Sequence, residues 1–97
     1  MNSEYFYQQG IEKTQKEDYD GALEDLEKAL QLDSNNIEAY KQRGAVYLAL
    51  GNHQKALTNF NHALQSNPND AEIYEIRGLA YFTLGNTQEA IDDITQE

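Results

Sequence analysis

The chain has 97 residues, enough for one small domain, and its formal net charge is -10, from 17 acidic and 7 basic side chains. This charge argues against nucleic acid or an anionic membrane surface as the main partner, because both attract basic proteins. The chain has no cysteine, which excludes disulfides and thiolate metal sites. No apolar run approaches the roughly 20 residues of a membrane span, and the initial MNSEYFYQQG lacks the pattern of a secretory signal. We therefore expect a soluble, cytoplasmic chain.

Apolar residues recur at gaps of three and four along the chain, which is the spacing of amphipathic helices. Gly51 and Gly85, each followed by asparagine, stand where such a pattern stops, as expected of helix ends that need a left-handed backbone. Pro68 suits the entry to a further helix. The predicted helices, in chain order, span residues 3–16, 19–32, 37–50, 53–66, 71–84 and 87–97. Their short loops predict antiparallel neighbours.

The segment YKQRGAVYLALGN, residues 40–52, returns 34 residues later as YEIRGLAYFTLGN, residues 74–86. A period of this length indicates stacked supersecondary units, here pairs of helices. The predicted fold is an all-α solenoid of antiparallel helix pairs wound into a right-handed superhelix. Residues 1–97 form one domain in this interpretation, with repeats at 3–36, 37–70 and 71–97, the last truncated.

A glycine recurs in the middle of the first helix of each unit, at Gly10, Gly44 and Gly78. Glycine costs a helix about 1 kcal/mol relative to alanine, so its position needs a reason. We expect Gly44 to face Ala56 and Ala63, where the absent side chain lets the two backbones approach closely.

The second unit resembles the tetratricopeptide repeat (TPR) family, whose pattern has aromatic, small and alanine positions at set spacings followed by proline. It matches at Tyr40, Gly44, Tyr47, Ala56, Phe60, Ala63 and Pro68. The third unit matches at Tyr74, Gly78, Tyr81, Ala90 and Ile94. The first unit departs from the pattern, with Lys13 where the others have tyrosine. The resemblance covers nearly the whole chain, about 2.8 repeats.

The resemblance implies a noncatalytic interaction module that binds a peptide or helix in a concave groove, as part of a larger scaffold or adaptor. Carried onto this chain, the groove residues are Tyr7, Ile11, Glu38, Lys41, Ala45, Leu48, Glu72, Glu75, Leu79 and Phe82. Because the floor of this set is apolar and its rim is acidic, the expected ligand is a protein or peptide with basic and apolar side chains.

Some TPR proteins bind the C-terminal carboxylate of chaperones through a clamp of Lys, Asn and Arg side chains. The matching positions here are Tyr7, Ile11, Gln42, Glu72 and Ile76, and none has the required type. Glu72 would also repel an anionic terminus, so chaperone binding of this kind is not expected.

Two patterns suggest metal binding, and we reject both. In KEDYDGALEDLE, Asp18 and Glu27 occupy ligand positions of a calcium loop, but Lys16 stands at the first, so a helix surface explains the segment better. His53 and His62 lie on opposite faces of one helix and cannot share a metal. We expect no metal and no cofactor.

Neighbouring carboxylates such as Asp25 and Asp93 have no partner base or nucleophile, so we interpret them as a charged outer face and expect no enzyme. Arg43 and Arg77, which precede the packing glycines, are either ligand contacts or structural residues paired with carboxylates, and the structural interpretation is favoured.

The last predicted helix leaves Ile91 and Ile94 with no successor to cover them, and the chain stops at Glu97. We expect a fragment of a longer protein. The alternative function is therefore self-assembly, in which a homo-oligomer forms end to end or by a helix swap through this uncapped C-terminal helix.

Overall fold

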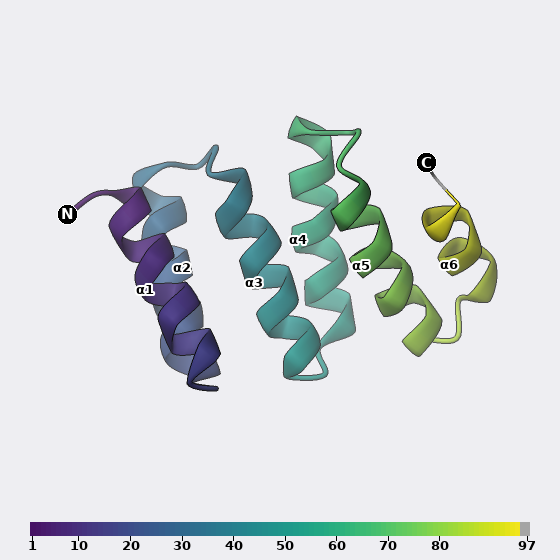
Figure 1. Ribbon diagram of the computed structural model, residues 1–97, viewed down its shortest axis with the longest axis horizontal. Coiled ribbons are helices and arrows are strands. Elements are labelled where there is room, and N and C mark those ends of the chain that lie inside the picture. Colours follow the sequence, from purple (N-terminus) through teal and green to yellow (C-terminus); the bar gives the residue numbers. More distant parts are fainter. Residues whose placement is uncertain (96–97) are drawn as a thin grey trace.

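The computed structural model describes residues 1–95 and is helical through most of this range (Figure 1). The helices are α1 (Ser3–Gln15), α2 (Tyr19–Leu32), α3 (Ile37–Ala49), α4 (His53–Ser66), α5 (Ala71–Thr83) and α6 (Thr87–Ile94). The first five agree with the predicted bounds to within one residue at each end. The last helix ends at Ile94, earlier than predicted, and the predicted extension over residues 96–97 lies outside the described residues.

The helices form three pairs, α1 with α2, α3 with α4 and α5 with α6, which follow one another along the long axis of the molecule (Figure 1). The first helices of successive pairs also touch, α1 with α3 and α3 with α5. The result is an elongated stack of 42 × 25 × 17 Å with the first and last helix pairs at opposite ends. In the described part of the chain, no helix is long and apolar enough to cross a bilayer.

A polar side chain caps the start of each of the first five helices. An Asn or Asp accepts a hydrogen bond from the backbone N–H three residues later, at Asn2, Asp18, Asn36, Asn52 and Asp70. Each cap satisfies an N–H that the helix leaves unpaired and contributes about 1 kcal/mol. Asp18, the supposed calcium ligand, is one of these caps, and the segment that follows it is α2.

Gly51 and Gly85 have the left-handed backbone expected of them, with φ of +80° and +84°. Behind Gly51, the N–H of Asn52 donates to the carbonyl of Tyr47 at 2.8 Å, which closes the helix end. The corresponding residue after α1 is Glu17, which adopts φ +61° although it has a side chain. Glu17 is therefore strained where its two counterparts are not.

The buried core forms two clusters, each shared between neighbouring pairs. Leu26 and Ala29 of α2 pack with Ala39 and Val46 of α3, and Phe60 and Ala63 of α4 pack with Ile73 of α5. These shared clusters hold the stack together because no pair buries its apolar surface alone.

The packing glycines allow a close approach, and the nearest atoms at Gly44 belong to a residue that the sequence prediction did not name. A Cβ atom on Gly44 would lie 2.5 Å from the ring of Phe60. The equivalent contact at Gly78 is looser, 3.1 Å from Ile94. The space that the glycine leaves is filled by a large side chain of the second helix, which packs directly against the backbone of the first helix.

Glu17→Gly should stabilise the chain by about 0.5–1 kcal/mol, because glycine adopts φ +61° without strain. The free energy of unfolding from urea titration measures this. Glu17→Gln is the matched control that removes the charge alone, and it should reproduce only a small part of the gain. An equal gain from both variants would contradict the backbone origin of the effect.

Gly44→Ala should destabilise the chain by about 1–3 kcal/mol, because Phe60 is fully buried and cannot move away from the new methyl group. Gly78→Ala should change stability by less than about 1 kcal/mol, since its looser contact is offset by the better helix propensity of alanine. The free energies of unfolding of the two variants, measured by urea titration, test this difference. In a Phe60→Leu background the cost of Gly44→Ala should shrink, and an unchanged cost would rule out the ring as its cause.

Candidate functional site

All the predicted groove residues lie on α1, α3 and α5, which contact one another in that order. We call the surface formed by these residues the α1–α3–α5 face. Ile11, Ala45 and Leu48 are partly buried in it, whereas Leu79 and Phe82 are 60% and 65% exposed. The apolar surface of this face is therefore most accessible on α5.

Lys41 is the centre of a carboxylate cluster on this face. Its ammonium nitrogen lies 3.1 Å from Glu72 Oε1, 3.0 Å from Asp70 Oδ2 and 3.7 Å from Glu38 Oε1, and only 14% of the side chain is exposed. Burial opposes its charge, but the hydrogen bonds that Lys41 donates to Asp70 and Glu72 outweigh burial and raise the Lys41 pKa. The cluster joins α3 to the first turn of α5.

Asp70 was not among the predicted groove residues. It has two roles here, because one carboxylate oxygen accepts from the N–H of Ile73 as the cap of α5 while the group also binds Lys41. Burial opposes its ionisation, but the bond to Lys41 and the backbone bond lower the Asp70 pKa. Because the folded pKa lies below the unfolded one, this stabilisation is present at neutral pH and is lost as the pH falls through the folded pKa. The sequence signal that could have identified Asp70 was its position directly before the predicted start of α5, where a capping residue is expected.

Tyr7 occupies on α1 the position that Lys41 has on α3. Burial raises the pKa of its hydroxyl, and the negative charges of Glu38 and Glu4 raise it further. The structure thus brings Tyr7, Glu38, Lys41 and Glu72 into one electrostatic neighbourhood. Since Lys41 is already paired, the charge that this neighbourhood offers to a ligand is negative.

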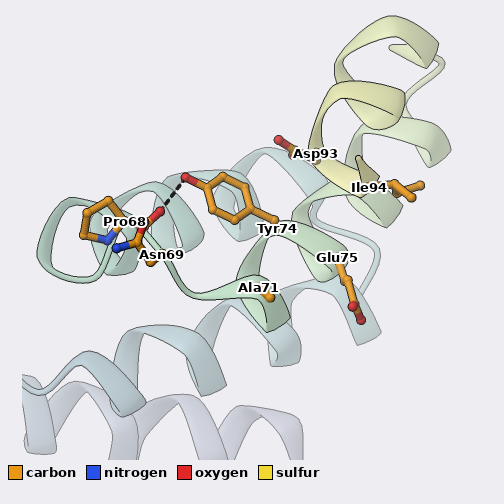
Figure 2. Close-up of a pocket in the computed structure, with 7 residues that line it drawn as sticks. All are labelled: Pro68, Asn69, Ala71, Tyr74, Glu75, Asp93 and Ile94. Carbon is orange, nitrogen blue, oxygen red and sulfur yellow. Dashed lines mark hydrogen bonds between the residues drawn. The ribbon is translucent and has the colours of Figure 1, made fainter. Parts of the chain in front are cut away.

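A cavity of about 260 Å³ opens at the α5–α6 end of the stack, and Figure 2 shows its lining. Tyr74 lines it and donates a hydrogen bond from its hydroxyl to the carbonyl of Pro68 at 2.7 Å. The lining residues are Pro68, Asn69, Ala71, Tyr74, Glu75, Asp93 and Ile94. Of the predicted groove residues only Glu75 contributes, so sequence reasoning missed this cavity.

Comparison with known families assigns the fold. A family model described as tetratricopeptide repeat matches residues 13–77, about two thirds of the chain, and a second model with the same description matches residues 71–96. This chain belongs to the tetratricopeptide repeat family. The predicted family and the all-α solenoid are confirmed, and the family is typically one of noncatalytic interaction modules.

Solved TPR structures superpose on most of this chain. The crystal structure of MamA does so with a TM-score of 0.92 at 27% identity, over 96% of this chain and 54% of MamA. YrrB, described as a TPR protein with an unusual peptide-binding site, superposes with a TM-score of 0.88 at 27% identity, over 96% of this chain and 48% of the YrrB chain. The chain thus spans about half the length of these two proteins. No curated protein matches its sequence.

A further TPR structure was solved with a ligand. The first TPR of Spaghetti (RPAP3), bound to the HSP90 peptide SRMEEVD, superposes with a TM-score of 0.91 at 25% identity, over 95% of this chain and 73% of that one. In the present TPR chain, Ile76 packs against the core, Tyr7 is partly buried and Glu72 is bonded to Lys41. None of these three positions offers a cation to a carboxylate.

A cation and a polar group also meet behind the α1–α3–α5 face in each pair. Arg77 binds Asp93 through two hydrogen bonds of 2.7 and 2.8 Å, and Arg43 donates to Asn59 at 2.6 Å. The interpretation of Arg77 as a structural residue paired with a carboxylate is therefore confirmed, whereas Arg43 binds an amide and not a carboxylate. Arg77 also lies over the rings of Tyr74 and Tyr81.

The prediction that Asp25 and Asp93 belong to a charged outer face was wrong, because only 5% and 6% of these residues is exposed. Each needs a cation, since burying an unpaired charge is costly. Lys13 supplies it to Asp25 at 2.7 Å, and the hydrogen bond to Asp25 raises the Lys13 pKa. The lysine that departs from the TPR pattern thus has a partner in its own pair.

The histidines lie apart from any metal-binding arrangement. His62 stacks on the ring of Tyr40, with centroids 4.9 Å apart and planes 7° from parallel. Within residues 1–95, no three His, Asp or Glu side chains gather as metal ligands would.

Arg77→Met should destabilise the chain by about 2–3 kcal/mol, because it leaves the buried Asp93 carboxylate without its cation. Arg43→Met removes the same atoms from the neighbouring pair but leaves a neutral amide, so it should cost only about 1 kcal/mol. Thermal and urea unfolding of the two variants provide the comparison. Equal losses would show that packing of the arginine stem, not charge, determines the effect.

Proposed function

We propose that this chain is a noncatalytic module, part of a larger cytoplasmic scaffold or adaptor, that binds a peptide or helix with basic and apolar side chains on its α1–α3–α5 face. The observation that carries the proposal is the Lys41 cluster. The cation of this face is enclosed by Glu38, Asp70 and Glu72, so a ligand meets carboxylates beside exposed apolar side chains.

The two kinds of group have different roles. Leu79 and Phe82 present exposed apolar surface that a bound side chain would remove from water, so they determine how long the ligand stays. Glu38 and Glu72 have side chains that are 60% and 67% exposed. Their charges increase the association rate of a basic ligand, and salt screens this effect. Tyr7 and Lys41 contribute polar groups between them. The remaining groove residues complete the surface: Ile11, Ala45, Leu48 and Glu75.

Relatives support a peptide ligand in general terms. A solved TPR domain binds the HSP90 peptide SRMEEVD, and YrrB is described as having a peptide-binding site. The proposed ligand differs from that acidic peptide, because the exposed charges among the groove residues are carboxylates. Basic segments fit this face better than acidic ones.

The alternative function is self-assembly through the C-terminal helix. It draws support from Ile91 and Ile94, which are 48% and 54% exposed on α6. Its weakness is electrostatic, since each copy carries a net charge of -10 and copies repel one another.

A matched pair of peptides tests the proposed ligand chemistry. With both C-termini amidated, the acidic heptapeptide SRMEEVD should bind this chain weakly, whereas SRMKKVD, in which lysines replace both glutamates, should bind about tenfold more tightly at low salt. The preference should shrink as salt is added, because the carboxylates are solvent-exposed. Fluorescence anisotropy of labelled peptides measures the two affinities and their dependence on salt. Tighter binding of SRMEEVD would overturn the proposal.

Variants of the chain assign this binding to the face. Glu38→Lys with Glu72→Lys should abolish the preference for SRMKKVD, and Leu79→Ala with Phe82→Ala should weaken both peptides without loss of helicity in circular dichroism. Asp20→Lys and Glu24→Lys on exposed positions of α2 form the control with the same change of charge. Loss of the preference in this control would assign it to net charge and not to the α1–α3–α5 face.

A further inference from the structure

The cavity around Tyr74 occupies a place that is filled in the preceding pairs. A shift of 34 residues maps its lining onto Ser34, Asn35, Ile37, Tyr40, Lys41, Asn59 and Phe60. There, the first turn of α5 covers the surface. Asp70 and Glu72 bind Lys41, and Ile73 joins Phe60 in the core with Ile37 and Tyr40 packed alongside.

The first turn of α3 is placed in the same way on the first pair. Ala39 packs in the core beside Phe6 and Tyr7, and Asn36, the cap of α3, donates a side-chain hydrogen bond to Ser3 at 2.8 Å. Ser3 corresponds to Ala71 of the cavity. Two junctions inside this chain therefore show that this position receives the first turn of a helix.

The third occurrence of this position is uncovered in the structure. Ile94 is 54% exposed, whereas its counterparts Leu26 and Phe60 are fully buried. Ala71, Tyr74, Glu75 and Ile94 are among the residues that line the cavity (Figure 2). Its apolar surface has the composition that accepts a helix turn at the other two junctions.

The charge of the third position differs from that of the first two. Tyr7 and Lys41 face the acidic first turns of α3 and α5, but Glu75 takes their place beside the cavity. Asp93 in the same lining is already paired with Arg77. An acidic first turn that suits Lys41 would meet a like charge at Glu75, so the favoured charge is inverted.

We propose that the Tyr74 cavity is a docking site for the first turn of a partner helix that carries a lysine or arginine in that turn, where α5 carries Glu72, and apolar residues where α5 carries Ile73 and Ile76. Such a cation pairs with Glu75 while the apolar residues cover Tyr74 and Ile94.

A second copy of this chain fits the site poorly. Stacked head to tail, it would present the first turn of α1, in which Glu4 corresponds to Glu72, and so place a carboxylate beside Glu75. The site thus selects against continuation of the stack by identical copies. This differs from the peptide binding proposed for the α1–α3–α5 face, because it concerns the α5–α6 end.

Two synthetic peptides probe the site in the full chain. One has the sequence of residues 68–84, and the other has the same sequence with E72K. Followed by ¹⁵N NMR at low salt, the E72K peptide should bind about tenfold more tightly and shift the signals of Tyr74 and Ile94. In the Glu75→Lys chain the preference should reverse toward the unmodified peptide.

Control variants separate binding at the Tyr74 cavity from binding at the α1–α3–α5 face and from the effect of net charge. Glu24→Lys on α2 makes the same charge change elsewhere and should leave the preference for the E72K peptide intact. Ile94→Glu should abolish binding of both helical peptides but leave binding of SRMKKVD unchanged, so failure of one proposal is distinguishable from failure of the other. Equal binding of the two helical peptides, no binding of either, or self-association of the chain with Tyr74 and Ile94 at the contact would each overturn the proposal.

Discussion

The contact between the two helices of each pair, made through a glycine in the first helix, is the constraint on which the rest of the structure depends. Gly10 receives Leu26, Gly44 receives Phe60 and Gly78 faces Ile94. Because the glycine has no side chain, a large residue of the second helix fits against the first helix. In the first two pairs that residue, Leu26 or Phe60, also lies in the core that the next pair completes, so one contact determines both the shape of a pair and the surface on which its neighbour packs.

A second recurring position adds charge specificity to this packing. Asp25, Asn59 and Asp93 occupy equivalent buried places on the second helices, and each is bound by a cation of the first helix in its own pair. A buried ion pair contributes little net stability, yet the loss of one partner is costly. The cation comes from two different positions of the repeat, because Arg43 and Arg77 are equivalent whereas Lys13 corresponds to Tyr47 and Tyr81. The acceptor also varies, since Arg43 binds a neutral amide where Arg77 binds a carboxylate.

The residues at Tyr7, Lys41 and Glu75 show how one position of a repeat can acquire separate roles. Lys41 is paired with Asp70 and Glu72 where α3 meets α5, so the charge left exposed on the α1–α3–α5 face is negative. Glu75 has the opposite charge at a position where no further helix of the described chain lies. The peptide binding proposed for the face and the helix docking proposed for the end both rest on this change of charge from one repeat to the next.

The sequence by itself determined the family, the helices and the order in which they pair, because these depend on local spacing and on a period visible in one dimension. It also identified the left-handed glycines and the pairing of Arg77 with a carboxylate. It did not reveal that Gly44 meets Phe60, that Asp25 and Asp93 are buried, or that Asp70 binds Lys41, since helix periodicity gives the face of a residue but not the rotation and offset between two packed helices. Only the tertiary structure decided those offsets, through the fit of large side chains against glycine. The cavity at Tyr74 depends on them too, because it is formed by residues from the α4–α5 loop, α5 and α6 that are brought together only when the helices pack.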